Sequence, residues 1–120
     1  MACEVEATDE FQAWFAGLNP EEQADVVAYV DLLEERGPHL PFPYSSGLGQ
    51  SRHGHVRELR IQHRGRPYRV LYAFDPRRVA ILLHGGEKTG DDRWYDVNVP
   101  VADQVYDEHL SQLRAEGLIQ

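Results

Sequence analysis

Cysteine is nearly absent from this chain, since Cys3 is the only one among 120 residues. A single thiol cannot form an internal disulfide, which excludes disulfide-stabilised secreted domains and fits a reducing compartment. No apolar run approaches the roughly 18 residues of a membrane span, and residues 1–6 lack the basic and then hydrophobic pattern of a signal peptide. We therefore expect a cytoplasmic protein with no membrane partner.

The whole chain has a net charge of -8, and its basic residues are scarce except in the middle of the sequence. Residues 1–51 hold ten acidic residues and one basic residue, and residues 94–120 hold five and one. Residues 52–93 hold ten basic residues, nine of them arginine, against five acidic ones. Arginine suits bidentate contact with phosphate, so a polyanion is the first partner to consider. Charge also gathers on solvated strands and turns, which is the alternative explanation.

The N-terminal half predicts one short strand and two helices. Residues 3–7 alternate apolar and acidic side chains, as a strand with one buried face does. Thr8 can cap a short helix, and Asn19, followed by Pro20, can cap a longer one that stops at Gly37. Residues 37–54, rich in proline, glycine and serine, are predicted to be a loop.

The C-terminal half predicts three strands and one helix. Strands are expected at residues 55–63, 67–74 and 79–84, with Gly85-Gly86 ending the third, and a last helix is expected to begin at Pro100. Short connections imply an antiparallel meander. The prediction for residues 1–120 is a single α+β domain, in which a small antiparallel sheet of about four strands packs with two N-terminal helices and one C-terminal helix.

The strands that should be half-buried each carry a basic side chain. Strand alternation places Arg60 on the face opposite Leu59, whereas Arg57 shares the face of Leu59. Arg69 alternates with large apolar side chains in the same way. We expect these cations to converge on one surface of the sheet, although the strand register that decides this is not contained in the pattern.

Several short motifs follow one another along nearly the whole chain. They are Glu4-Val5-Glu6, Asp9-Glu10-Phe11 with Trp14-Phe15, Arg57-Glu58-Leu59-Arg60, the run Arg69 to Pro76, Gly86-Glu87-Lys88, Arg93-Trp94-Tyr95, and a proline-opened helix with Ala102 and His109-Leu110. Their order and spacing resemble the RelE/ParE superfamily of bacterial type II toxins, in particular its HigB-like, phage Gp49-related branch. In that branch the position of Glu87 is often aspartate.

The resemblance implies an endoribonuclease that cleaves mRNA on the translating ribosome and arrests growth. The implied mechanism needs no metal and no other cofactor, because the 2'-hydroxyl of the substrate attacks the adjacent phosphorus. The resemblance also implies a helix-turn-helix antitoxin that neutralises the toxin in a hetero-oligomer.

Five residues are expected to carry the catalysis. Arg69 is the first candidate for stabilising the charge of the phosphorane, with Arg60 and Arg57 beside it. Lys88 is a candidate for a further phosphate contact or for proton transfer. His84 could act as acid or base near neutral pH, or it could be a strand-end histidine hydrogen-bonded to the backbone.

A second set of residues is expected to bind RNA. Tyr95 could stack on a base of the splayed mRNA, whereas Trp94 could stack or could anchor its loop to the core. The other candidates for RNA contacts are Arg93, His55, Arg52 and Arg66. His53 and His55 have a spacing that suggests a metal, but no cysteine lies close to them in sequence, so no metal site is expected.

Two other functions remain open on the sequence alone. ParE-like members of the same superfamily inhibit DNA gyrase without cleaving RNA, and a decayed prophage remnant would only bind an antitoxin-like repressor. A set of cations on one sheet face favours the nuclease, because a protein-binding inhibitor does not need it.

Overall fold

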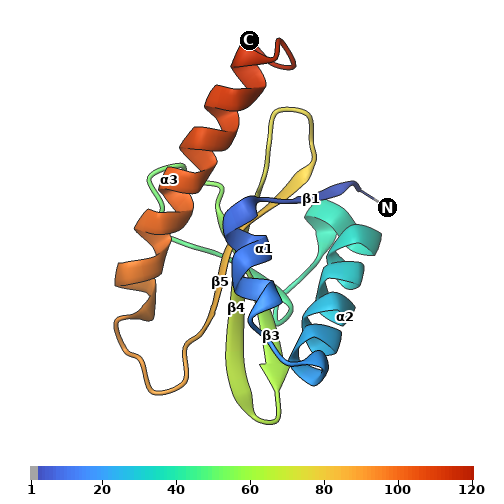
Figure 1. Cartoon of the computed structure of the whole chain (residues 1–120), viewed down its shortest axis with the longest axis vertical. Coiled ribbons are helices and arrows are strands. Elements are labelled where there is room, and N and C mark those ends of the chain that lie inside the picture. The colour runs from blue at the N-terminus through green and yellow to red at the C-terminus, as the bar shows by residue number, and fades with distance from the viewer. Residues whose placement is uncertain (1–2) are drawn as a thin grey trace.

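The computed structural model describes residues 3–120, and its centre is a five-stranded sheet (Figure 1). The strands are β1 (Val5–Ala7), β2 (Ser45–Gly47), β3 (Arg57–His63), β4 (Arg66–Phe74) and β5 (Ala80–Glu87), in the spatial order β1-β5-β4-β3-β2. The antiparallel meander of β3, β4 and β5 confirms the prediction. The sheet is mixed rather than purely antiparallel, because β1 pairs with β5 in parallel.

The helices confirm the α+β class and cover both faces of the sheet. Figure 1 shows α1 (Asp9–Ala16) and α2 (Pro20–Arg36) on one face and α3 (Trp94–Ala115) on the other. The predicted caps form: Phe11 N donates to Thr8 Oγ1 at 3.2 Å, and Asn19 and Glu22 exchange two hydrogen bonds of 2.8 Å. None of the helices within residues 3–120 is long and apolar enough to cross a membrane.

Alternation along β4 divides the interior into two cores. Tyr68, Val70 and Tyr72 pack with α1 and α2, whereas Leu71 and Ala73 pack with α3. The same alternation sends the side chain of Arg69 toward α3, where it is buried. A buried guanidinium needs compensating partners, and those of Arg69 come from β3 and α3.

The region predicted to be a loop contains two short elements. A 3₁₀ turn, η1 (Gly37–His39), follows α2, and β2 then pairs antiparallel with β3. The prediction of an unbroken loop over 37–54 was therefore wrong, and the sheet has five strands rather than about four. Strand β2 contains only serine and glycine, so its pairing depends on the neighbouring strand and not on an apolar alternation of its own.

The C-terminal helix begins at Trp94, and Pro100 lies inside it, so the prediction that Pro100 opens the helix was wrong. Proline removes one amide donor, the one that would reach the carbonyl of Asp96 in the turn before it. Asp96 is exposed, so water can satisfy this carbonyl. The first turn is held by the buried Trp94 and by Asn98, whose Nδ2 donates to the Trp94 carbonyl at 2.8 Å.

Strand β5 continues through Gly85-Gly86 to Glu87, contrary to the prediction that the two glycines end it. They are needed because two tryptophans lie against opposite faces of the strand. A Cβ at Gly85 would lie 2.3 Å from the ring of Trp14, and one at Gly86 would lie 2.7 Å from Trp94 Nε1. The glycines therefore allow the close approach of α1 and α3 to the sheet.

Gly85→Ala is expected to lower the free energy of unfolding by about 1–3 kcal/mol, because the new methyl group overlaps the Trp14 ring and forces α1 away from β5. Urea unfolding of the two proteins measures the change. Gly49→Ala is the matched control, since a Cβ there meets nothing within 4 Å, and it should change stability by less than about 0.5 kcal/mol. Equal losses in both variants would contradict the packing argument.

Candidate functional site

The strand register brings together the two arginines that the sequence placed first. Arg60 of β3 lies directly opposite Arg69 of β4, and both side chains point to the face of the sheet that α3 covers. Glu58, two residues before Arg60, lies on the same face. Two guanidinium groups and one carboxylate therefore share a small region between the sheet and α3.

Glu58 is the centre of this cluster and is 4% exposed. Its Oε1 accepts a hydrogen bond from the Tyr95 hydroxyl at 2.5 Å and forms an ion pair with Arg69 Nε at 3.1 Å. Its Oε2 accepts from Ser46 Oγ at 2.6 Å and from Arg60 Nη1 at 3.2 Å. Both oxygens are therefore satisfied, which is the condition under which a carboxylate can be buried without a large penalty.

Tyr95 and Lys88 bound the cluster on the α3 side. Burial, and after it the hydrogen bond to Glu58, raises the pKa of the Tyr95 hydroxyl, although Arg69 acts in the opposite direction. The hydroxyl therefore keeps its proton at neutral pH. Lys88 Nζ lies 5.5 Å from the centroid of the Tyr95 ring, on the loop between β5 and α3.

The two arginines differ in their access to a ligand. Arg69 is only 4% exposed, and it also donates from Nη1 to the Tyr68 carbonyl at 3.0 Å and from Nε to the Tyr95 hydroxyl at 3.3 Å. The side chain of Arg60 is 29% exposed. Arg60 and the half-buried Lys88 can therefore contact an incoming anion, whereas Arg69 is mainly committed to the protein.

Arg57 does not join the other two arginines, so the prediction that it lies beside them was wrong. It pairs with Tyr72, whose ring belongs to the core under α1 and α2, and its Nε donates to Ser45 Oγ at 3.1 Å. The physical reason is the period of two along β3, which sends residues 57 and 60 to opposite faces.

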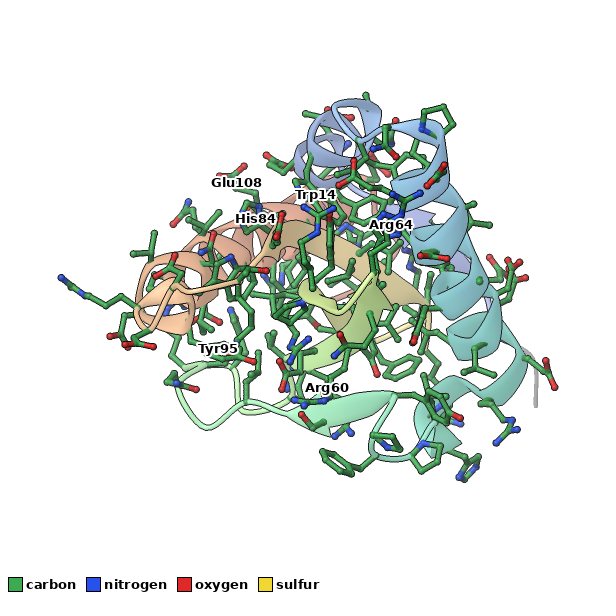
Figure 2. All side chains as sticks on the ribbon, turned by 90° about the horizontal axis from the view of Figure 1, so that it is seen from below. Trp14, Arg60, Arg64, His84, Tyr95 and Glu108 are labelled. Carbon is green, nitrogen blue, oxygen red and sulfur yellow. The ribbon has the colours of Figure 1, made fainter. Side chains whose placement is uncertain are left out.

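His84 lies on the α3 face but outside the cluster. Its Nε2 is 2.7 Å from Asn98 Oδ1, so its hydrogen-bond partner is a side chain of α3 and not the backbone. Figure 2 shows His84 well apart from the labelled Tyr95 and Arg60. The structure thus brings together Arg60, Arg69, Lys88 and Tyr95 of the predicted residues.

The remaining residues predicted to bind RNA are dispersed. Arg93 is exposed and immediately precedes α3 next to Tyr95, so it borders the cluster. Arg66 lies near the hairpin turn, where it pairs with Glu87 at 3.3 Å and with Glu22 at 3.9 Å. Arg66 is therefore already partnered by acidic side chains within the protein.

Arg52 and His55 lie against the middle of α3. Arg52 forms a two-pronged ion pair with Asp107, and this hydrogen bonding lowers the pKa of the Asp107 carboxyl. His55 Nε2 is 3.3 Å from the Tyr106 hydroxyl. These contacts attach the loop before β3 to α3 and do not converge with Arg60.

Residues 13–107 match the family of phage-derived Gp49-like proteins. The chain belongs to this family. The match extends from α1 into α3 and therefore includes every member of the cluster around Glu58.

Two relatives of this Gp49-like protein come from Mycobacterium tuberculosis and are named as toxins. HigB3 is 42% identical over 107 residues, which cover 88% of this chain and 92% of HigB3. HigB2 is 42% identical over 106 residues, which cover 87% of this chain but 53% of HigB2, so the chain spans about half of that relative. The resemblance to the HigB-like, Gp49-related branch is confirmed.

Solved structures confirm that the fold of this Gp49-like protein is that of RelE. The RelBE2 toxin-antitoxin complex from Mycobacterium tuberculosis contains a chain that matches with a TM-score of 0.55 and 20% identity, covering 72% of this chain and 99% of that one. The archaeal RelE-RelB complex from Pyrococcus horikoshii OT3 contains a chain that matches with a TM-score of 0.53 and 18% identity, covering 73% of this chain and 97% of that one.

Sequence reasoning missed the role of Glu58 in this Gp49-like protein. The signal was present, because alternation along β3 already places Glu58 on the face of Arg60. A charged residue at a position that should be buried is itself informative. The partners Ser46 and Tyr95 could not have been found in this way, since they come from other elements and meet Glu58 only in the folded chain.

Proposed function

We propose that this Gp49-like protein is the toxin of a type II toxin-antitoxin system and acts as a metal-independent endoribonuclease on mRNA in the translating ribosome. The observation that carries the proposal is the cluster around Glu58, in which an accessible arginine and a lysine are held beside a buried arginine and a tyrosine. Such preorganised donors suit the charge that develops on a phosphate under attack.

The proposed reaction is a transesterification within the RNA. The 2'-oxygen forms a bond to the adjacent phosphorus while the bond from phosphorus to the 5'-oxygen of the next nucleotide breaks. The products are a 2',3'-cyclic phosphate and a 5'-hydroxyl, and the proton of the 2'-hydroxyl is balanced by the proton that the leaving oxygen gains. No oxidant, reductant or metal enters this balance.

Each residue of the cluster is assigned a task in this reaction. Arg60 stabilises the non-bridging phosphate oxygens, because its side chain is partly exposed and its guanidinium is suited to phosphate. The buried Arg69 holds Glu58 and Tyr95 in place through an ion pair to Glu58 and a hydrogen bond to the Tyr95 hydroxyl. Lys88 contacts the phosphate or protonates the leaving 5'-oxygen. Tyr95 keeps its proton and orients the substrate.

The distribution of acidic residues is compatible with RNA on this face. All ten acidic residues of the first 51 lie between positions 4 and 35, which are in or next to β1, α1 and α2. Helices α1 and α2 cover the face of the sheet opposite the cluster (Figure 1). The acidic residues of α1 and α2 therefore lie on the side of the sheet away from the proposed RNA. The net charge of -8 belongs to the whole chain and is not the electrostatic potential at the site.

The proposed partners are a helix-turn-helix antitoxin and the ribosome with its mRNA. The two structural neighbours are complexes of a toxin with an antitoxin, and the same kind of hetero-oligomer is proposed here. Charge complementarity favours an antitoxin that covers the basic cluster.

Induced expression in a bacterium, followed by mapping of mRNA 5' ends on a translated and an untranslated copy of one transcript, tests the function. New 5'-hydroxyl ends confined to the translated copy are expected. Growth arrest without such ends would contradict the nuclease and favour the inhibition of gyrase. The absence of arrest would leave a protein that only binds a repressor.

A further inference from the structure

The segment before β2 presents an exposed aromatic ring next to the cluster around Glu58. Phe42 is 69% exposed, more than any other large apolar side chain in the described part of the chain. A single exposed apolar residue would need no explanation. This ring, however, lies beside Arg60, and the backbone around it is hydrogen-bonded to β3.

The backbone around Phe42 is tied firmly to β3. The amides of Tyr44 and Ser45 both donate to the Pro41 carbonyl, at 2.9 and 3.1 Å, and so close a tight turn around residue 42. The amide of Arg60 then donates to the Tyr44 carbonyl at 2.8 Å. Phe42 is also flanked by two prolines, which restrict the backbone on both sides. The ring is therefore exposed, and the backbone that carries it is held in place relative to β3 and Arg60.

The ring adjoins the cation assigned to the substrate phosphate. The guanidinium carbon of Arg60 lies 5.2 Å from the centroid of the Phe42 ring, within the range of a cation–π contact. Arg60 reaches Glu58 with Nη1, so the arginine links the ring to the cluster. Tyr95 contacts Glu58 from α3, so aromatic rings from two distant parts of the chain border the same pair of charges.

We infer that Phe42 is a stacking surface for a base of single-stranded RNA, next to the phosphate that Arg60 binds. This inference rests on the proposed function and adds a residue to its binding site. A nucleotide is a flat aromatic base joined to an anionic phosphate, and the fixed pair of an exposed ring and an arginine is complementary to both parts. Single-strand readers use this combination of stacking and backbone contact.

The other exposed apolar side chains do not fit this role. Val27, Val97, Val101 and Leu118 are aliphatic and have no flat face on which a base could stack. Tyr44 is also exposed, but its ring lies 6.4 Å from that of Tyr29 and faces α2. A base that stacks on Phe42 is not recognised by its hydrogen-bonding groups, so the stacking should contribute affinity rather than strict sequence recognition.

The test uses bacterial ribosomes programmed with a short mRNA that carries 2'-O-methyl groups at the cleavage site, which block attack. The site is first mapped with the wild-type protein on unmodified mRNA. 2-Aminopurine, whose fluorescence falls when it stacks, then replaces each nucleotide beside the mapped site in turn. Quenching at one of these positions is expected with the wild type and with Phe42→Trp.

Phe42→Ala is expected to lose the quenching and to bind the programmed ribosome about 5- to 100-fold more weakly. Phe42→Leu, which keeps an apolar side chain without a flat face, should also lose the quenching. Leu118→Ala is the matched control for loss of an exposed apolar side chain, and it should behave as the wild type. Thermal unfolding checks that each variant is folded.

The possible results separate the stacking from the proposed function. If the wild type cleaves but Phe42→Ala keeps its affinity and its quenching, the stacking inference is overturned and the nuclease stands. If the wild type neither cleaves nor binds, both fail. If Phe42→Ala binds RNA normally but no longer binds its co-expressed antitoxin, the ring is a protein-docking residue, and the inference is overturned in favour of that role.

Discussion

Arg60→Ala is expected to slow mRNA cleavage by about 100-fold or more, since loss of one preorganised donor to a developing oxyanion typically has an effect of this size. Arg60 is the arginine of the cluster whose side chain remains accessible, at 29% exposure. Single-turnover cleavage on programmed ribosomes measures the rate of the chemical step. The effect should fall mainly on this rate and less on binding, because the charge that Arg60 neutralises is greatest in the transition state.

Two variants make the test of Arg60 specific. Arg60→Lys keeps the charge but loses the planar fork, so its rate should lie between those of the wild type and the alanine variant. Arg36→Ala removes an exposed arginine from the end of α2, on the far side of the sheet, and should cleave at the wild-type rate. Cleavage by Arg60→Ala at the wild-type rate would remove Arg60 from the proposed mechanism.

Glu58→Ala is expected to lower the free energy of unfolding by about 3–5 kcal/mol, the usual result of removing one partner from a buried ion pair. The carboxylate accepts hydrogen bonds from Arg60, Tyr95 and Ser46 and forms an ion pair with Arg69. Its loss leaves the guanidinium of Arg69, which is 4% exposed, with an uncompensated charge. Urea unfolding measures the loss, which corresponds to a fall in Tm of about 10–20 °C for a chain of this size.

A double-mutant cycle separates this charge effect from a simple loss of packing. Glu58→Ala combined with Arg69→Met removes both charges, so the double variant should be more stable than Glu58→Ala alone. Glu35→Ala, an exposed position on α2, is the control and should change stability by less than about 0.5 kcal/mol. Strictly additive losses in the cycle would show that Glu58 and Arg69 are not coupled.

Local signals in the sequence determined the fold class and most of the element order. The caps at Thr8 and Asn19 and the meander of three strands are as predicted, because each depends on residues near one another in the chain. The approximate extent of β3 and β4 was predicted for the same reason. The cationic strands that supply Arg60 and Arg69 could also be recognised from alternation alone.

The tertiary structure alone decided where β5 ends, where α3 begins and that β2 forms. Gly85-Gly86 looked like a strand end, and only the two tryptophans packed on either face explain why the strand continues. Pro100 looked like a helix start, although buried Trp94 begins the helix before it. Strand β2 has no apolar pattern and forms only because it pairs with the edge of β3.

The candidate site shows the same division between local pattern and tertiary contact. Alternation assigns each side chain to a face of its own strand, so the separation of Arg57 from Arg60 was already determined by the sequence. Which residues meet on that face depends on the register between strands and on the placement of α3, and both are set by contacts between residues far apart in the chain. Only those contacts bring Ser46, Arg69 and Tyr95 to the carboxylate of Glu58.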